Sequence, residues 1–148
     1  MVDKHLNENF NLINEISKVG EGDRDLQSAI IKFVCFFNYF EYVLSKNGIK
    51  GWYNFHHKYS IEDEYIQDYF DFFNKRYVEN NETNQKFEDL CKTVQNQYKT
   101  ELKRNLIECK EKLHTLLSIS YYYRNNLYHG HKGLSELKDY TDCFNNIS

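Results

Sequence analysis

The stretch Leu26–Gly48, LQSAIIKFVCFFNYFEYVLSKNG, decides the fold class of this chain. Its large apolar side chains recur every three or four residues, as Leu26, Ile30, Phe33, Phe37, Phe40 and Leu44. This spacing places them on one face of an α-helix. Asn47-Gly48 is a typical C-terminal stop, and Asp23 or Asp25 can cap the start. The stretch therefore predicts a long amphipathic helix.

The same helical spacing continues on both sides of this stretch. Predicted helices surround Leu6–Ile16, Tyr65–Phe73, Phe87–Tyr98, Leu102–Leu117 and Leu134–Phe144. Asn80–Asn84 ends the third helix, and we expect a bend near Tyr98 because one helix of about 40 residues is uncommon in a small domain. No strand alternation is visible. The pattern predicts one all-α domain over residues 1–148, a bundle of about five or six helices.

The connecting segments are less regular. Residues 48–60 contain Trp52, Phe55 and the pair His56-His57, and they are predicted to form a loop or an irregular turn. Ser60 is a candidate cap for the following helix, although Asp63 replaces the Glu or Gln of a full capping box. Gly20-Glu21-Gly22 is predicted to end the first helix.

Composition limits the classes of function. The chain has 148 residues, no proline, 17% aromatic residues and a formal net charge of −3. A protein that coats nucleic acid usually has a basic excess. Action on RNA therefore requires a local basic patch. The chain is long enough for a sizeable core.

The sequence also indicates a compartment. The N-terminus lacks the apolar segment of a signal peptide, and we find no stretch that approaches the ~20 apolar residues of a membrane span. Four cysteines lie far apart among apolar neighbours, which is typical of free buried thiols in a reducing cytoplasm: Cys35, Cys91, Cys109 and Cys143. We predict a cytoplasmic protein without membrane contact.

One short run near the C-terminus contains groups suited to phosphodiester chemistry: Arg124-Asn125-Asn126-Leu127-Tyr128-His129-Gly130. Arginine stays charged and binds phosphate bidentately. Histidine takes and gives protons near neutral pH. On a helix Asn125 and His129 share one face, whereas Arg124 and His129 are about 140° apart. Either the helix ends before His129, or a two-fold partner completes the site.

The run Tyr123–Gly130 resembles the Arg-x4-His motif of the HEPN superfamily of helical ribonucleases. The detailed likeness covers residues 121–133. It implies an α-helical homodimer in which two motifs line a shared cleft. It also implies a metal-independent endoribonuclease that needs no cofactor and acts as a toxin or an antiviral defence effector.

The resemblance also implies roles for individual residues. His129 would be the general acid or base at the ribose 2′-hydroxyl or the leaving 5′-oxygen, and Arg124 would hold the scissile phosphate. Asn125 would orient the histidine or the phosphate. Substrate contacts are predicted for Tyr128, His131 and Lys132. One branch of the family has a tyrosine that an antitoxin modifies, but His131 stands at that place. An antitoxin or regulatory partner remains among the expected partners.

Alternatives remain for the motif. A non-catalytic HEPN-like module would bind RNA or protein through the same residues. Alternatively, Arg124 and His129 satisfy the carbonyls of a helix end, with Gly130 as the residue after it. His129, His131 and His56-His57 do not have the spacing of a metal site, so no metal is predicted.

Three other features have a structural and a functional interpretation. Lysines and arginines between Lys99 and Lys112 alternate with glutamates and favour an ion-paired, solvated face over phosphate contacts. Tyr121–Tyr123 must place at least one ring in the core, and the others can stack on bases or contact a dimer partner. The acidic, aromatic run Glu62–Asp71 favours a plain amphipathic surface helix over a docking face for a basic partner.

Overall fold

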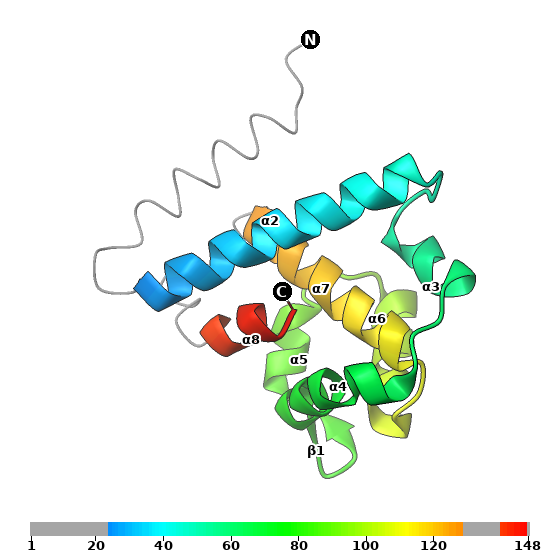
Figure 1. Ribbon diagram of the computed structural model, residues 1–148. Helices are drawn as coiled ribbons and strands as arrows, with labels where there is room; N and C mark the ends of the chain where they lie inside the picture. The colour runs from blue at the N-terminus through cyan, green and yellow to red at the C-terminus, as the bar shows by residue number, and fades with distance from the viewer. Residues whose placement is uncertain (1–23, 129–139, 148) are drawn as a thin grey trace. The chain divides into compact units, whose positions relative to one another are not determined.

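The computed structural model describes residues 24–128 and 140–147, and its helices confirm the predicted all-α class (Figure 1). The N-terminal segment predicted to form a first helix lies outside the described residues. The elements are, in order, α2 Arg24–Lys46, a 3-10 turn η1 Trp52–Asn54, α3 Phe55–Lys58, α4 Asp63–Tyr77, β1 Val78–Glu79, β2 Glu82–Thr83, α5 Gln85–Leu90, α6 Asn96–Glu108, α7 Lys112–Tyr128 and α8 Thr141–Ile147.

The chain divides into two compact units, and α2 and α7 each contribute residues to both. One unit comprises Met1–Asn38 and Arg124–Ser148, and the other comprises Tyr39–Tyr123. In the first unit, the rings of Phe33 and Phe144 lie 5.3 Å apart, and both are fully buried. The predicted apolar stripe of α2 thus includes core residues of this unit.

The Tyr39–Tyr123 unit has its core around α4, which packs against α5 and α6. The buried face of α4 is Ile66, Phe70, Phe73 and Tyr77, spaced as the sequence predicts. Tyr123 joins this core from α7: its hydroxyl hydrogen-bonds that of Tyr77, and Tyr122 is buried as well. The prediction that the tyrosine triplet supplies core side chains is confirmed.

The predicted loop at residues 48–60 is partly helical, because η1 and α3 lie within it. Gly51, the residue before η1, has φ 82, a left-handed backbone conformation that glycine adopts easily. The predicted cap at Ser60 is wrong. Helix α4 begins after Glu62, whose side chain makes no capping bond.

A short hairpin follows α4, although the sequence shows no strand alternation. Val78 pairs with Thr83, and Glu79 pairs with Glu82. Asn80 and Asn81 form the turn with φ 51 and 62, the left-handed region in which asparagine is well tolerated. Two-residue strands are too short for a period-2 pattern, so the turn residues were the only available signal.

The predicted bend near Tyr98 is misplaced. The chain instead breaks after Leu90 and again after Glu108, which gives three helices where two were expected. At the second break Cys109 and Glu111 adopt φ 52 and 47, and neither is a glycine. The apolar spacing runs on through Cys109, so periodicity alone does not show this break.

Two further predictions need correction. Cys91 and Cys143 are buried, but Cys35 and Cys109 are exposed, and all four are free thiols. By length and composition, helix α2 could cross a membrane. This differs from the prediction that no segment of the chain approaches a membrane span. Core helices of soluble proteins and signal sequences pass the same test, so this finding does not assign a compartment.

Candidate functional site

The C-terminal part of α7 holds three of the predicted site residues: Arg124, Asn125 and Tyr128. The Nη1 atom of Arg124 donates a hydrogen bond to Oδ1 of Asn125 at 3.1 Å. The guanidinium carbon of Arg124 lies 4.5 Å from the centroid of the Tyr128 ring, a cation–π contact. These residues are one and four positions apart, so a helix brings them together without help from distant sequence.

The side chain of Tyr128 is held in place by a hydrogen bond of its own. Its hydroxyl donates a hydrogen bond to Oδ1 of Asn38 at 3.2 Å, within the same unit of the chain. Tyr128 therefore connects the guanidinium of Arg124 to α2. The neighbouring amide Asn126 is buried, with 7% of its surface exposed, and belongs to the packed side of the helix.

The remaining predicted site residues, His129, His131 and Lys132, lie outside the described residues, as does Gly130. Their predicted roles stay predictions. The structure brings together Arg124, Asn125 and Tyr128, and the chain continues directly from Tyr128 to His129.

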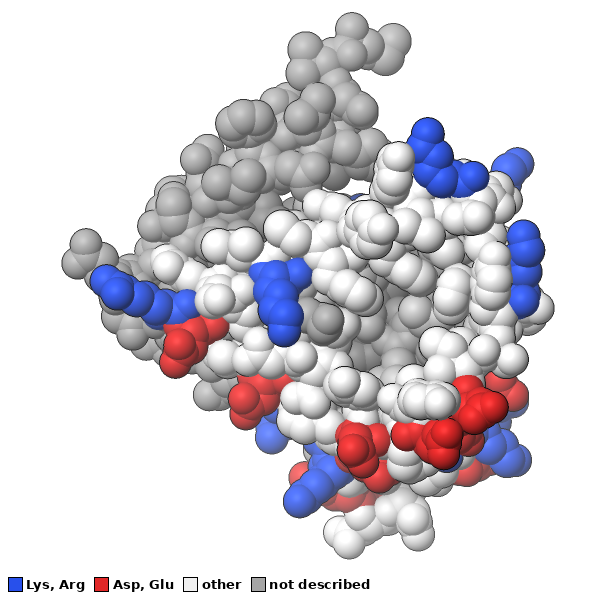
Figure 2. Space-filling view, in the orientation of Figure 1, with Lys and Arg blue, Asp and Glu red and all other residues white. Residues whose placement is uncertain are grey.

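The basic residues before the motif are largely ion-paired. Lys99 pairs with Glu88, Lys110 with Glu108 at 2.8 Å, and Lys112 with Asp63 at 3.1 Å. On the face drawn in Figure 2, lysines and arginines lie singly among acidic and neutral groups and form no continuous basic surface over the described residues. The ion-paired face is the better interpretation of these lysines.

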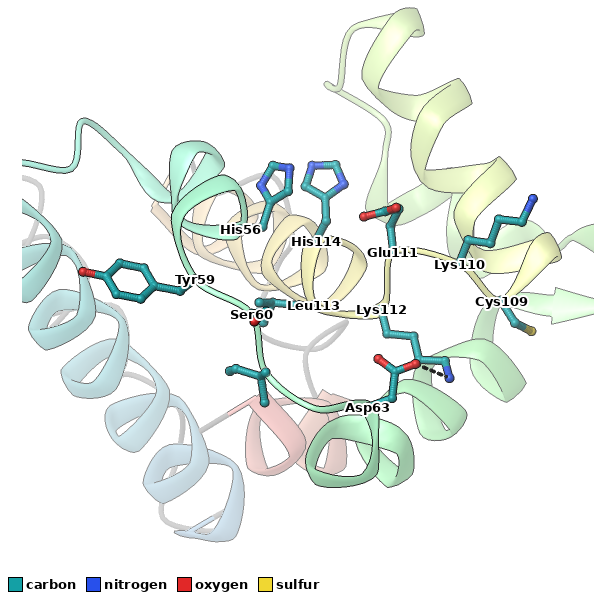
Figure 3. A pocket seen from close by; sticks show the side chains of 11 residues that line it. His56, Tyr59, Ser60, Asp63, Cys109, Lys110, Glu111, Lys112, Leu113 and His114 are labelled. Atoms are coloured by element: carbon teal, nitrogen blue, oxygen red, sulfur yellow. Dashed lines mark hydrogen bonds and ion pairs between the residues drawn. The ribbon is translucent and has the colours of Figure 1, made fainter.

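The structure reveals a second group of titratable residues in the Tyr39–Tyr123 unit. A cavity of about 430 Å³ lies beside the start of α7 and is lined by side chains that include His56, Tyr59, Asp63, Lys112 and His114. Figure 3 shows His56 and His114 side by side, with Glu111 next to His114 and the Lys112–Asp63 pair apart from them. The His56-His57 pair was visible in the sequence, but its meeting with His114 was not.

The surroundings of His56 and His114 favour the neutral form of both imidazole rings. Burial is the main cause that lowers the pKa of His114, and the charge of His56 lowers it further. Burial and the neighbouring His57 lower the pKa of His56. Within the described ranges, no group of three His, Cys, Asp or Glu side chains is placed to hold a metal ion.

Cys91 is a poor candidate for a nucleophile. Burial raises the pKa of its thiol to about 12, so the reactive thiolate is scarce at neutral pH. The buried thiol is a core residue of the Tyr39–Tyr123 unit.

Comparison of the chain with models of protein families, with curated proteins and with solved structures finds no match.

Proposed function

We propose that the protein is a metal-independent endoribonuclease of HEPN type, which acts as a toxin or defence effector through Arg124, Asn125 and His129. The observation that supports this best is the orientation of Arg124. Its guanidinium is held by Asn125 and by the ring of Tyr128 at the end of α7, one residue before His129. A guanidinium fixed in this way is suited to bind a phosphate.

The proposed reaction is an internal transesterification of RNA. The ribose 2′-oxygen attacks the adjacent phosphorus and loses its proton to a general base, while the bond from phosphorus to the 5′-oxygen breaks. A general acid protonates the leaving 5′-oxygen. The products are a 2′,3′-cyclic phosphate and a 5′-hydroxyl, and no water or metal ion enters this step.

The residues of the motif divide this work. The imidazole of His129 serves as acid or base, and two copies in one cleft supply both roles. Arg124 stabilises the charge that accumulates on the phosphate oxygens. Asn125, through its bond to Arg124, is the positioning residue for the guanidinium.

Cleavage of total RNA in EDTA by the native protein and by two variants tests this proposal. We expect Arg124→Ala and His129→Ala each to lower the rate at least about 100-fold, because one loses charge stabilisation and the other loses proton transfer. Arg104→Ala is the matched control: this arginine is exposed on α6 and we assign it no role in the reaction.

The outcomes separate the two interpretations of the motif. Loss of cleavage in both variants, with unchanged circular dichroism and with full activity of Arg104→Ala, supports the nuclease. Native protein that retains RNA but leaves it intact contradicts the nuclease and favours a non-catalytic binding module. Equal activity of all four proteins indicates a contaminating enzyme and contradicts the proposal as well.

A further inference from the structure

Three imidazole rings from two separate elements meet within the Tyr39–Tyr123 unit. The ring centroids of His56 and His57 on α3 lie 3.8 Å apart, and those of His56 and His114 lie 4.3 Å apart. His114 is on the first part of α7 and has only 5% of its surface exposed. The cluster therefore joins α3 to α7 through rings tilted against one another, and Figure 3 shows His56 beside His114.

Aromatic side chains extend this contact. Trp52 stacks on His114 with a centroid distance of 6.0 Å and an interplanar angle of 19°, and it lies 5.1 Å from the Tyr121 ring. Tyr53 meets His114 edge-on at 5.4 Å. Residues 52–58 thus contact α7 through rings that surround one histidine. Trp52 is the single tryptophan of the chain.

The surroundings of the cluster suit uncharged rings. Nε2 of His114 is buried and makes no hydrogen bond to any described residue. Nδ1 of His56 is buried as well, and the Tyr53 backbone raises the pKa of His56 by less than burial lowers it. The nearest acidic atom, Oε1 of Glu101, lies 3.9 Å from Nδ1 of His114. A proton added to either ring would create a buried charge beside other imidazoles, which is unfavourable without a close partner.

The charged and titratable groups that face His114 come from every element around it. They are Tyr53 on η1, His56 and His57 on α3, Glu101 on α6, and Glu111 just before α7. The two glutamates raise the pKa of His114, but burial lowers it more. The balance favours the neutral ring while the segment is docked.

The direction of the pH effect follows from this balance. An imidazole released to solvent has its ordinary pKa of 6.5, whereas the docked ring has a lower one. The released state therefore binds more protons as the pH falls. Docking is at full strength above pH 6.5 and weakens progressively below it.

We propose that His56 and His114 form a pH-sensitive latch: protonation of these two rings below neutral pH releases residues 52–58 from helix α7. The helices that carry the fold need not unfold, because η1 and α3 are short and their side chains are half-buried or exposed. The latch is independent of the proposed nuclease motif.

The fluorescence of Trp52 in the full-length chain reports on this latch. We expect the emission maximum to shift to the red between about pH 7.5 and about pH 5, with a midpoint below 6.5, because the ring leaves its stack. Acrylamide should quench the emission more strongly at the lower pH, while the helical circular dichroism signal persists. A fall in intensity without a red shift means that Trp52 stays docked, and it overturns the proposal.

Two variants should move the midpoint in opposite directions. His57→Asn removes a neighbouring positive charge and should raise the midpoint by roughly half a pH unit. Glu101→Gln removes a carboxylate that favours protonated His114 and should lower it. His114→Phe keeps a ring against Trp52 and should greatly reduce the transition. If His57→Asn and Glu101→Gln leave the midpoint unchanged, or move it in the same direction, the latch is contradicted.

Discussion

At the scale of single residues, the side chain of Arg124 is held by contacts of two different kinds. Asn125 accepts a hydrogen bond from one of its nitrogens, and the Tyr128 ring lies against its flat face. A lysine ammonium in place of the guanidinium would lose the planar arrangement of donors that binds phosphate bidentately, and most of the stacking on the ring. The arrangement restricts where the guanidinium points, and such restriction is useful for a residue that binds a phosphate.

Substitutions of Tyr128 separate the contact of its ring with Arg124 from the hydrogen bond of its hydroxyl to Asn38. Tyr128→Phe keeps the ring against Arg124 and loses the hydroxyl bond to Asn38, so its kcat/KM on RNA should stay near that of the native protein. Tyr128→Leu loses the aromatic face and should lower kcat/KM by roughly 2- to 30-fold, which corresponds to the strength of a cation–π contact. Initial rates on a short RNA provide the comparison. A larger loss in the Phe variant than in the Leu variant would contradict this role of the ring.

At the scale of elements, apolar periodicity predicted where helices exist better than where they end. The stripe from Leu26 to Leu44 lies in α2 as expected. The break at Cys109 was missed because it depends on backbone angles, and Cys109 itself continues the apolar spacing. The close contacts among Arg124, Asn125 and Tyr128 follow from sequence proximity on one helix. The contact of His114 with His56 joins distant parts of the chain, so no local pattern could show it.

The break after α6 gives a prediction for stability. Cys109 has φ 52, a left-handed conformation that a side chain makes unfavourable. Cys109→Gly should therefore raise the free energy of unfolding by about 0.5–1 kcal/mol. Lys103→Gly, at an exposed position inside α6, should lower it by about 1 kcal/mol. Urea denaturation followed by circular dichroism measures both, and a loss of stability in both variants would show that the left-handed angle costs nothing here.

At the scale of the whole molecule, the two compact units are continuous through α2 and α7. The predicted site residues that are described lie in the unit that contains Arg124–Ser148, whereas the histidine latch lies in the Tyr39–Tyr123 unit. The two proposals can be tested separately, because variants at His57 or Glu101 leave the motif unchanged.

The shared-cleft mechanism requires two copies of the chain. One chain has a mass of 18.0 kDa, so sedimentation equilibrium should give about 36 kDa, which is 2 × 18.0 kDa. Arg124→Ala should sediment in the same way if it affects the reaction rather than the assembly. A mass near 18.0 kDa at the concentrations where RNA is cleaved would contradict a cleft formed by two copies.

The chemistry of the cleaved ends tests the central claim most directly. A short RNA, and the same RNA with one 2′-deoxy nucleotide at the main cleavage position, are incubated with native protein in EDTA and analysed by mass spectrometry. Attack by the 2′-oxygen predicts a 2′,3′-cyclic phosphate and a 5′-hydroxyl from the first substrate, and no cleavage at the modified position. Intact RNA, 5′-phosphate ends, or cleavage at the 2′-deoxy nucleotide would contradict the account.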